Sequence, residues 1–311
     1  MIGHAFAKAI LFGEHSVVYG RPAIAVPVTD VRATVVVENT APGSGIVIYA
    51  TDIGHTIDVR NAAPDEPLSL TVRNTLEHLG QRLEGDMSLT IRSTIPVASG
   101  LGSGAAVATA MVRALSTHLG QPLGPASVSQ LVYETEKCFH GTPSGIDNTV
   151  IAFEQPVYFG KGQPIETFAV KTPFYIAIAD TGLPSLTGES VADVRAAWQR
   201  DPQRYNAIFD SIGAIVDQAR QAIEMGEVNT LGARMNENQH LLRALEVSSP
   251  DLETLIAAAL QAGAAGAKLS GGGRGGNMIA LIAPDNTEQI RCALLEAGAK
   301  QVIVTQVGTS A

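Results

Sequence analysis

The chain has 311 residues, of which 45% are hydrophobic, and a formal net charge of -9. This length exceeds the usual limit of one hydrophobic core, about 250–300 residues, and predicts two adjoining lobes. The acidic balance argues against a general nucleic-acid or membrane-surface binder, because such proteins need clustered Lys and Arg. An anionic substrate is compatible with this balance through a local cationic site.

Cysteine usage and hydropathy predict a cytoplasmic protein. Cys138 and Cys292 form neither a metal-binding pattern nor a disulfide framework, which is typical of a reducing compartment. The first residues lack the basic and apolar regions of a secretory signal. No apolar run reaches the roughly 18 residues of a membrane-spanning helix. We therefore expect no membrane partner and no nucleic-acid partner.

The first lobe, residues 1–165, is expected to combine a mostly antiparallel sheet with several helices. Periodicity and turn signals predict the following elements. Strands are expected at 23–28, 33–38, 45–49, 87–93 and 157–159, and helices at 67–79, 105–118 and 127–139. Ser127 is the expected N-cap of the last helix, which a Gly- and Pro-containing loop ends.

The second lobe, residues 166–311, is expected to be a small α/β sandwich. Strands are expected at 174–180, 267–269, 277–283 and 301–306, and helices at 187–200, 202–226, 227–246, 250–263 and 287–298. This order predicts helices on one face of an antiparallel sheet, so the whole chain is of the α+β class. The lobe boundary is expected near residues 160–175.

A glycine loop at 96–106 reads Pro-Val-Ala-Ser-Gly-Leu-Gly-Ser-Gly-Ala-Ala. Its glycines leave backbone amides unshielded directly before a helix N-terminus, which favours a bound anion. The alternative is a tight strand-to-helix turn without a ligand. A P-loop is excluded, because no Lys follows Gly104. If phosphate binds here, its lysine comes from elsewhere in the chain.

A second glycine cluster spans 271–276 and contains Arg274. A dinucleotide-binding loop needs a strand before the glycines and a helix after them, whereas here a strand follows. The remaining interpretations are a loop that approaches a substrate phosphate, with Arg274 as a charged donor, or a β-turn with a solvated arginine.

Two other segments place charged residues in unusual surroundings. Lys8, Glu14 and His15 lie among apolar residues, where each needs a partner or a ligand. Glu136 and Asp147 flank a loop rich in Gly and Pro, and carboxylates of this kind bind Mg²⁺ together with substrate phosphates. Ordinary explanations exist for both segments, namely a surface lysine with a core histidine, and a helix end with an Asx-turn.

Together these segments resemble the GHMP kinase superfamily. Its three short motifs are present in order, at Lys8–Gly20, Pro96–Ala106 and Gly266–Ala280. The first motif and the segment His-Gly-x-Pro-Ser-Gly-Ile-Asp-Asn at 140–148 are most similar to the mevalonate kinases. The resemblance implies a two-lobed GHMP kinase fold, with an N-terminal lobe like ribosomal protein S5 domain 2 and a C-terminal ferredoxin-like lobe.

The resemblance also implies a reaction, the ATP-dependent phosphorylation of the 5-hydroxyl of (R)-mevalonate in isoprenoid biosynthesis. Asp147 would accept the hydroxyl proton, and Lys8 would supply the positive charge that the glycine loop lacks. Mg²⁺ would lie near Glu136 and Ser103. The expected phosphate-binding residues are Pro96, Ser99, Gly100, Leu101, Gly102, Ser103, Gly104, Ala105 and Ala106. The expected substrate-binding residues are Glu14, His15, His140, Ser144, Thr187, Gly273 and Arg274.

Two positions depart from the family pattern, and several alternatives stay open. Gly104 stands where the family usually has a metal-binding serine, and Arg274 interrupts the glycines of the third motif. The alternatives are a phosphomevalonate kinase, another GHMP small-molecule kinase or related decarboxylase, and a non-catalytic ligand sensor on the same fold. Many mevalonate kinases are homodimers, so a homodimer is compatible with the resemblance.

Overall fold

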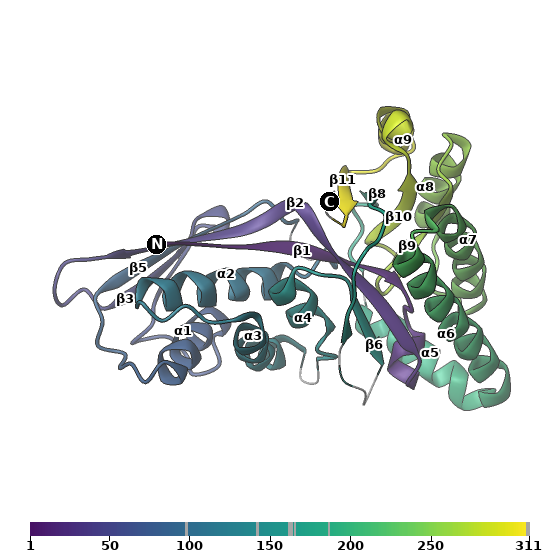
Figure 1. Cartoon of the computed structure of the whole chain (residues 1–311). Helices are drawn as coiled ribbons and strands as arrows, with labels where there is room; N and C mark the ends of the chain where they lie inside the picture. The colour runs from purple at the N-terminus through teal and green to yellow at the C-terminus, as the bar shows by residue number, and fades with distance from the viewer. Residues whose placement is uncertain (97–98, 141–142, 161–163, 165, 186, 309–311) are drawn as a thin grey trace. The chain divides into compact units, whose positions relative to one another are not determined.

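The computed structural model describes residues 1–96, 99–140, 143–160, 164, 166–185 and 187–308. The chain forms two compact units whose segments alternate along the sequence (Figure 1). The first unit comprises Met1–Lys8, Val31–Val97 and Leu101–Glu154, and the second comprises Ala9–Asp30, Ala98–Gly100 and Gln155–Ala311. The division into lobes 1–165 and 166–311 stays a prediction.

The first unit is built on a sheet of strand order β4-β3-β5-β2, with β1 paired to β2. Its strands are β1 (Ile2–Phe12), β2 (Pro22–Asn39), β3 (Ile46–Ala50), β4 (His55–Asp58) and β5 (Met87–Ser93). β2 and β5 are antiparallel, with Val35 opposite Ile91, whereas β3 and β5 are parallel. The end of β1 from Ala9 and the start of β2 up to Asp30 belong to the second unit.

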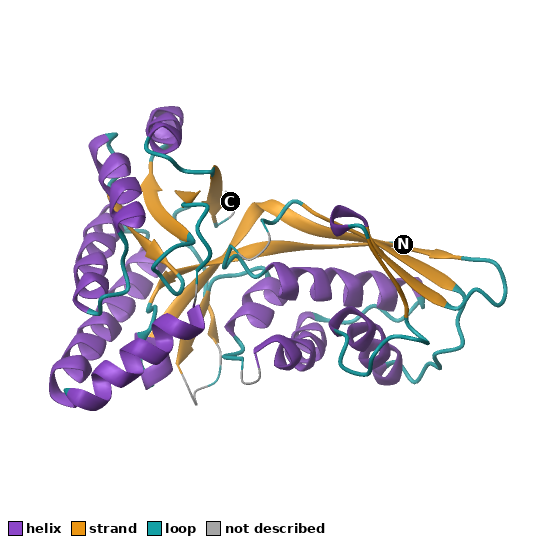
Figure 2. Cartoon of the chain, turned by 180° about the vertical axis from the view of Figure 1, so that it is seen from behind, coloured by secondary structure: helices purple, strands orange, loops and turns teal. Residues whose placement is uncertain are grey.

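Helices cover one face of this sheet, as Figures 1 and 2 show from opposite sides. They are α1 (Pro67–His78), α2 (Ser103–His118), α3 (Pro125–His140) and α4 (Ile146–Phe153), with the short η2 (Thr51–Ile53) beside β3. Alternate residues of β2 from Val31 to Val37 are buried, as expected of a strand with one covered face. Gly3 lets β1 lie close to α2, because a Cβ there would overlap the backbone of Ala110.

Several details of the first lobe differ from the sequence prediction. The strands expected at 23–28 and 33–38 are one strand, β2, because no glycine or proline interrupts residues 29–32; residues 23–28 are buried throughout, and burial alternates from Val31 onward. The N-cap expected at Ser127 is wrong: α3 begins at Pro125, since proline is well tolerated in the first helical turn. The sequence reading also missed β1, β4 and the short helix α4.

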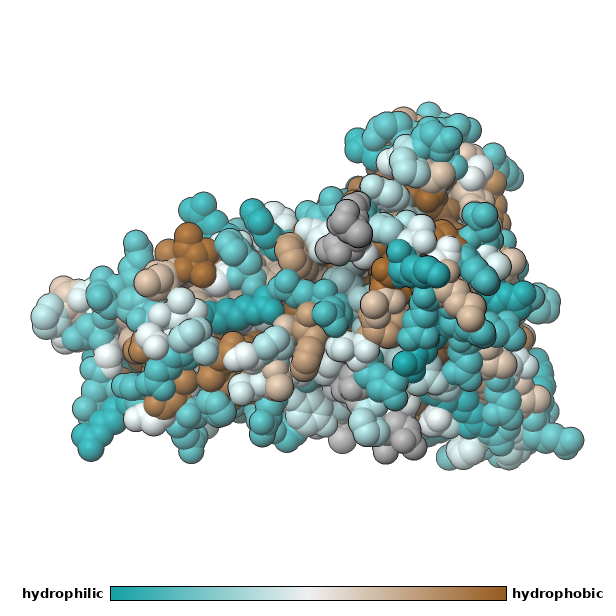
Figure 3. All heavy atoms as spheres, in the orientation of Figure 1, coloured by the Kyte–Doolittle hydropathy of each residue, from teal (hydrophilic) through white to brown (hydrophobic). Residues whose placement is uncertain are grey.

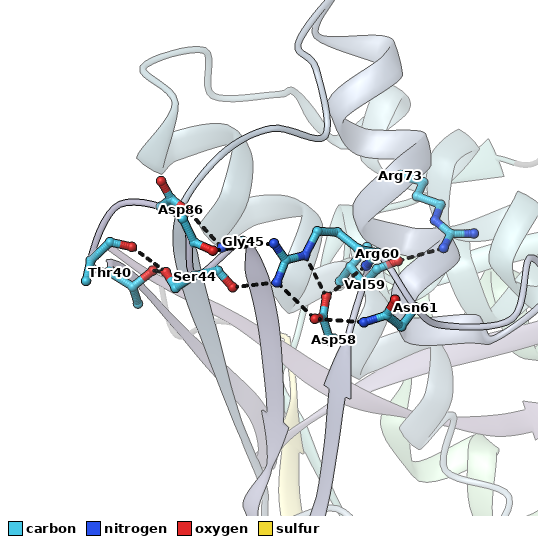
Figure 4. Close-up of polar contacts among 11 residues, drawn as sticks. Thr40, Ser44, Gly45, Asp58, Val59, Arg60, Asn61, Arg73 and Asp86 are labelled. Atoms are coloured by element: carbon cyan, nitrogen blue, oxygen red, sulfur yellow. Dashed lines mark hydrogen bonds and ion pairs between the residues drawn. The ribbon is translucent and has the colours of Figure 1, made fainter.

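A network of polar contacts ties two turns of the first unit together (Figure 4). The Arg60 guanidinium bonds to both carboxylate oxygens of Asp58 and to the Ser44 carbonyl. Asp86 accepts the amide of Gly45 at 2.7 Å. Arg73 donates to the Val59 carbonyl at 2.7 Å and so fixes α1 to the strand end. These contacts join the turn before β3 to the turn after β4 and to α1.

The second unit has a four-stranded antiparallel sheet of order β11-β8-β10-β9. These strands are β8 (Phe174–Asp180), β9 (Gly266–Ser270), β10 (Asn277–Ile282) and β11 (Gln301–Val307). The helices are α5 (Thr187–Arg200), α6 (Pro202–Met225), α7 (Val228–Ala244), α8 (Pro250–Gln261) and α9 (Thr287–Glu296). The antiparallel pairing of this sheet agrees with the predicted sandwich.

Shorter elements complete the second unit. They are η1 (Ser16–Tyr19), β6 (Val157–Gly160), β7 (Glu166–Thr167) and η3 (Pro284–Asn286). The start of β2 pairs with β6, Pro22 lying opposite Gly160.

Most of the face shown in Figure 3 is hydrophilic, with hydrophobic residues in small separate groups. Among the described residues, no helix has the length and apolar character needed to cross a membrane.

Candidate active site

Lys8 and Asp147 form an ion pair within the first unit. Lys8 lies on β1 and is 7% exposed, and its Nζ is 3.0 Å from Oδ1 of Asp147. Asp147 lies in the first turn of α4, behind Gly145 in a left-handed conformation. A carboxylate is favoured there by the positive helix end. The fold therefore brings the predicted catalytic cation and the predicted proton acceptor into direct contact.

Asn148, next to Asp147, fixes the orientation of α4. Its Nδ2 donates to the carbonyl and to Oγ of Ser129 on α3, at 3.0 and 2.9 Å. Asn148 is buried, so these bonds hold the first turn of α4 against α3. The sequence alone had not assigned Asn148 a role, because its partner lies 19 residues away on another helix.

Glu136 on α3 belongs to the same electrostatic group. It is 4% exposed, and its pKa is raised from 4.5 to about 7, mainly by burial and also by the charge of Asp147, while Lys8 acts in the opposite direction. Its carboxylate is therefore partly protonated near neutral pH until a cation neutralises it. The predicted set Lys8, Glu136 and Asp147 thus lies together, brought there by β1, α3 and α4.

The end of the glycine loop leads directly into α2. Gly102, with φ 73°, is the residue before the helix, and α2 begins at Ser103. The first amides of a helix have no intrahelical partner, so those of Gly104 and Ala105 suit a bound anion, whereas the Ala106 amide already donates to the Gly102 carbonyl at 2.9 Å. The Lys8 amide donates to the Leu101 carbonyl at 3.0 Å, which joins the Lys8 strand to this loop.

The earlier part of the loop has contacts of its own. Gly100 has a left-handed φ of 80°, and Ser99 is buried, with its carbonyl accepting from Nδ2 of Asn277. Pro96 is half-buried. Phosphate binding by these residues stays a prediction.

We expect Gly102→Ala to lower kcat by at least tenfold while Gly120→Ala leaves it unchanged. Both glycines have a left-handed φ, 73° and 72°, so both substitutions carry about 1–2 kcal/mol of backbone strain. A Cβ at Gly102 would lie 3.1 Å from Cγ of Lys8, whereas nothing lies within 4 Å at Gly120. Steady-state kinetics and thermal unfolding measure the two effects. Equal kcat in both variants would show that a Cβ at position 102 does not disturb Lys8.

Glu14 and Lys268 form a fully buried ion pair within the second unit. The Glu14 carboxylate bonds to Nζ of Lys268, and the two side chains are 1% and 0% exposed. Burial raises the pKa of Glu14 and lowers that of Lys268, and in each case the opposite charge of the partner counteracts this. A lysine without solvent contact is rare in proteins unless it is paired.

His15 follows Glu14 in a left-handed backbone conformation, with φ 60°. Its Nε2 lies 3.0 Å from the Gly272 carbonyl, so Nε2 carries the proton and donates it. The pKa of His15 is lowered from 6.5 to about 4, mainly by burial; the hydrogen bond to Gly272 acts to raise it, and the Arg274 charge acts to lower it. The imidazole is therefore neutral near pH 7.

Thr187 and the third glycine motif lie against each other. Thr187 begins α5, and a Cβ on Gly272 would overlap its side chain. Oγ of Ser185 donates to the Gly273 carbonyl at 3.3 Å. These contacts place Thr187 and Gly273 together, but their binding of substrate stays a prediction.

Arg274 is engaged by protein groups in this structure. Its guanidinium pairs with Asp193 on α5, and its Nε donates to the Glu246 carbonyl at 3.3 Å. The residue also has a left-handed φ of 59°, which is unfavourable for a non-glycine residue. The expected contact of Arg274 with a phosphate would require exchange of the Asp193 carboxylate for that phosphate.

If Arg274 binds a phosphate, Arg274→Ala should raise the KM of one substrate by about tenfold, because a charge-assisted hydrogen bond is lost. Asp193→Ala should leave that KM equal or lower, because it releases the guanidinium from its partner. Both Michaelis constants are measured for each variant. Unchanged constants in Arg274→Ala would reduce Arg274 to a residue that pairs with α5.

The remaining predicted residues are less informative. Ser144 is exposed, and its Oγ accepts the amide of Ile146 at 3.4 Å. His140 ends α3, and its side chain lies outside the described part of the chain. Lys268 is the buried residue that the sequence reading missed. Its signal was present, since a lone lysine stands in the apolar strand directly before the glycine cluster.

Comparisons with known proteins agree with this arrangement. The family model for the GHMP kinases N terminal domain matches residues 69–155, and that for the GHMP kinases C terminal matches residues 212–300. The chain belongs to the GHMP kinase family. The family prediction and the two-lobed GHMP kinase fold are thereby confirmed.

The relatives of this GHMP kinase are similar over almost their full length. The mevalonate kinase of Thermococcus sibiricus is 38% identical, over 97% of this chain and 95% of that protein. The mevalonate kinase of Pyrococcus abyssi is 36% identical, over 97% and 94%. The solved structure of L. major mevalonate kinase in complex with R-mevalonate is 30% identical, with a TM-score of 0.85, and covers 100% of this chain and 97% of that chain.

The donor set of this GHMP kinase suits a magnesium–phosphate complex better than a metal held by protein alone. Among the described residues, no three His, Cys, Asp or Glu side chains are grouped to hold a metal. Mg²⁺ commonly uses one or two carboxylates together with substrate phosphates. Glu136 offers a carboxylate beside Asp147, and Ser103 offers a hydroxyl at the start of α2. Gly104 offers no side-chain ligand.

Proposed function

We propose that this GHMP kinase catalyses the ATP-dependent phosphorylation of the 5-hydroxyl of (R)-mevalonate, which yields (R)-5-phosphomevalonate and ADP in the mevalonate pathway. The observation that carries the proposal is the near full-length identity of 36–38% to mevalonate kinases. The ion pair of Lys8 and Asp147 supports it, because the reaction needs a proton acceptor and a nearby cation. A cytoplasmic location is part of the proposal.

The chemistry follows from the first-unit residues. Asp147 accepts the proton of the 5-hydroxyl, and the resulting oxygen attacks the γ-phosphorus of ATP while the bond from that phosphorus to the leaving ADP oxygen breaks. Lys8 stabilises the negative charge that develops on the attacking oxygen. The amides at the start of α2 hold the phosphates, and Glu136 with Ser103 would hold Mg²⁺. When bound, Mg²⁺ neutralises phosphate charge.

The second-unit residues are proposed to select the substrate. Mevalonate carries a carboxylate and two hydroxyls, so its recognition requires hydrogen-bonding groups rather than an apolar pocket. Glu14 is an acceptor, and the neutral imidazole of His15 is held in one orientation by Gly272. Thr187 contributes a further hydroxyl at the start of α5.

A coupled assay of ADP release tests this function against its alternatives. Mevalonate, phosphomevalonate, galactose and homoserine are each supplied with ATP and Mg²⁺. We expect turnover with mevalonate to exceed that with each other compound by at least 100-fold, because the buried polar groups reject compounds that leave them unpaired. Preference for phosphomevalonate would instead indicate a phosphomevalonate kinase. Ligand binding without ADP release would indicate a sensor.

A further inference from the structure

The Glu14–Lys268 ion pair belongs to a set of contacts between the first and third motifs, all within the second unit. Oγ of Ser270 donates to the Ile10 carbonyl at 2.9 Å, and Nε2 of His15 donates to the Gly272 carbonyl at 3.0 Å. The ion pair joins residues 254 positions apart beside these two bonds in sequence. The three contacts thus link residues 10–15 to residues 268–272 as one assembly.

Lys268 is itself rigidly supported. It lies on β9, opposite Ile279 of β10. On the other edge of β9, Asn236 and Gln239 of α7 accept the amides of Ala267 and Leu269, at 3.0 and 2.9 Å. The Nζ of Lys268 also donates to the Leu269 carbonyl at 2.6 Å. These hydrogen bonds therefore fix the position of the charged Nζ of Lys268.

A charged pair at this position is not required for stability alone. Desolvation of two buried charges is costly, and well-packed apolar side chains of similar size often stabilise a protein equally well or better. The Phe12 ring, 6.0 Å from Nζ, shows that apolar neighbours are present to pack against such side chains. The pair is therefore explained better by a requirement for a charged Glu14 than by packing.

We propose that Lys268 is a positioning residue for substrate recognition, which keeps the Glu14 carboxylate ionised and fixed as an acceptor for a substrate hydroxyl. This inference rests on the proposed function. Lys268 has no solvent contact and acts through Glu14, and the turn that carries His15 depends on the same assembly. Its loss should weaken mevalonate binding and leave nucleotide binding unchanged.

A double-mutant cycle with Lys268→Met, Glu14→Met and the double variant tests the proposal. Lys268→Met leaves a buried carboxylate unpaired, so we expect its Tm to fall by roughly 10 °C. Its KM for mevalonate should rise by about tenfold or more, and its KM for ATP should stay within about twofold. In the double variant Tm should recover, but KM for mevalonate should stay as high as in the worse single variant.

Three outcomes would overturn the proposal. Recovery of both Tm and KM in the double variant would make the pair purely structural. Additive effects of the single variants on KM would show that Lys268 does not act through Glu14. An equal rise of KM for ATP and for mevalonate would indicate general distortion. If Lys268→Met does not fold, a native KM for mevalonate in the folded double variant would still overturn the proposal. Absence of mevalonate turnover in the unmodified protein would refute the proposed function instead.

Discussion

Asp147→Asn is expected to lower kcat for mevalonate by about 10²–10⁴-fold, the usual contribution of a positioned general base. Asparagine keeps the size of the side chain and a hydrogen-bonding oxygen near Lys8, but it does not accept the hydroxyl proton. Lys8→Met should cause a similar loss, because it removes the charge 3.0 Å from Asp147. The double variant should be little worse than the poorer single variant, since residues that act as a unit are strongly non-additive.

Asp210→Asn is the matched control for this prediction. Asp210 also forms an ion pair, in its case with Arg21, but it lies on α6 and is largely exposed. Its loss should change kcat by less than about twofold, because exposed ion pairs contribute little. Circular dichroism and thermal unfolding verify that Asp147→Asn is folded. Near-native kcat in folded Asp147→Asn would remove this residue from the role of proton acceptor.

Glu136→Gln is expected to inactivate the enzyme and yet stabilise the metal-free protein at alkaline pH. The folded pKa of about 7 lies above the ordinary 4.5, so the folded state binds more protons between these values, and stability falls as pH rises through them. Above pH 8 the ionised carboxylate costs about 3 kcal/mol, because one pKa unit corresponds to about 1.4 kcal/mol. Glutamine removes this cost.

Urea unfolding with EDTA, at several pH values from 5 to 8.5, measures this effect. The gain in the free energy of unfolding for Glu136→Gln over the unmodified protein should grow with pH and level off above pH 8. Glu134→Gln is the control, since Glu134 lies on the same helix, is 48% exposed and pairs with Lys137. If the gain in the free energy of unfolding for Glu136→Gln did not depend on pH, the raised pKa of Glu136 would be contradicted.

Local sequence patterns predicted most of the fold because they act over short distances. Apolar periodicity located helices such as α2 and α6, and alternation located β5 and β8. They failed where tertiary packing overrides local preference. β1 is rich in alanine and lacks a strong strand pattern, but it fits closely against α2 at Gly3. α4 has only eight residues, too few for a clear helical period.

The candidate site was predictable in its residue types but not in its partnerships. Motif resemblance indicated Lys8, Glu136 and Asp147, and the fold brings them together. The partner of Glu14 could not be inferred, because Lys268 lies 254 residues away and only the antiparallel pairing of β9 and β10 places it. The same limit applies to Arg274, whose partner Asp193 depends on the packing of α5.

The position of the transferred phosphate tests the central claim most directly. The protein is incubated with ATP, Mg²⁺ and (R)-mevalonate, and the product is examined by proton-coupled ³¹P NMR. Transfer to the 5-hydroxyl places the phosphate next to a CH₂ group, so we expect a monoester signal split into a triplet. An unsplit signal would indicate transfer to the tertiary 3-hydroxyl, and absence of any new monoester signal would contradict mevalonate kinase activity altogether.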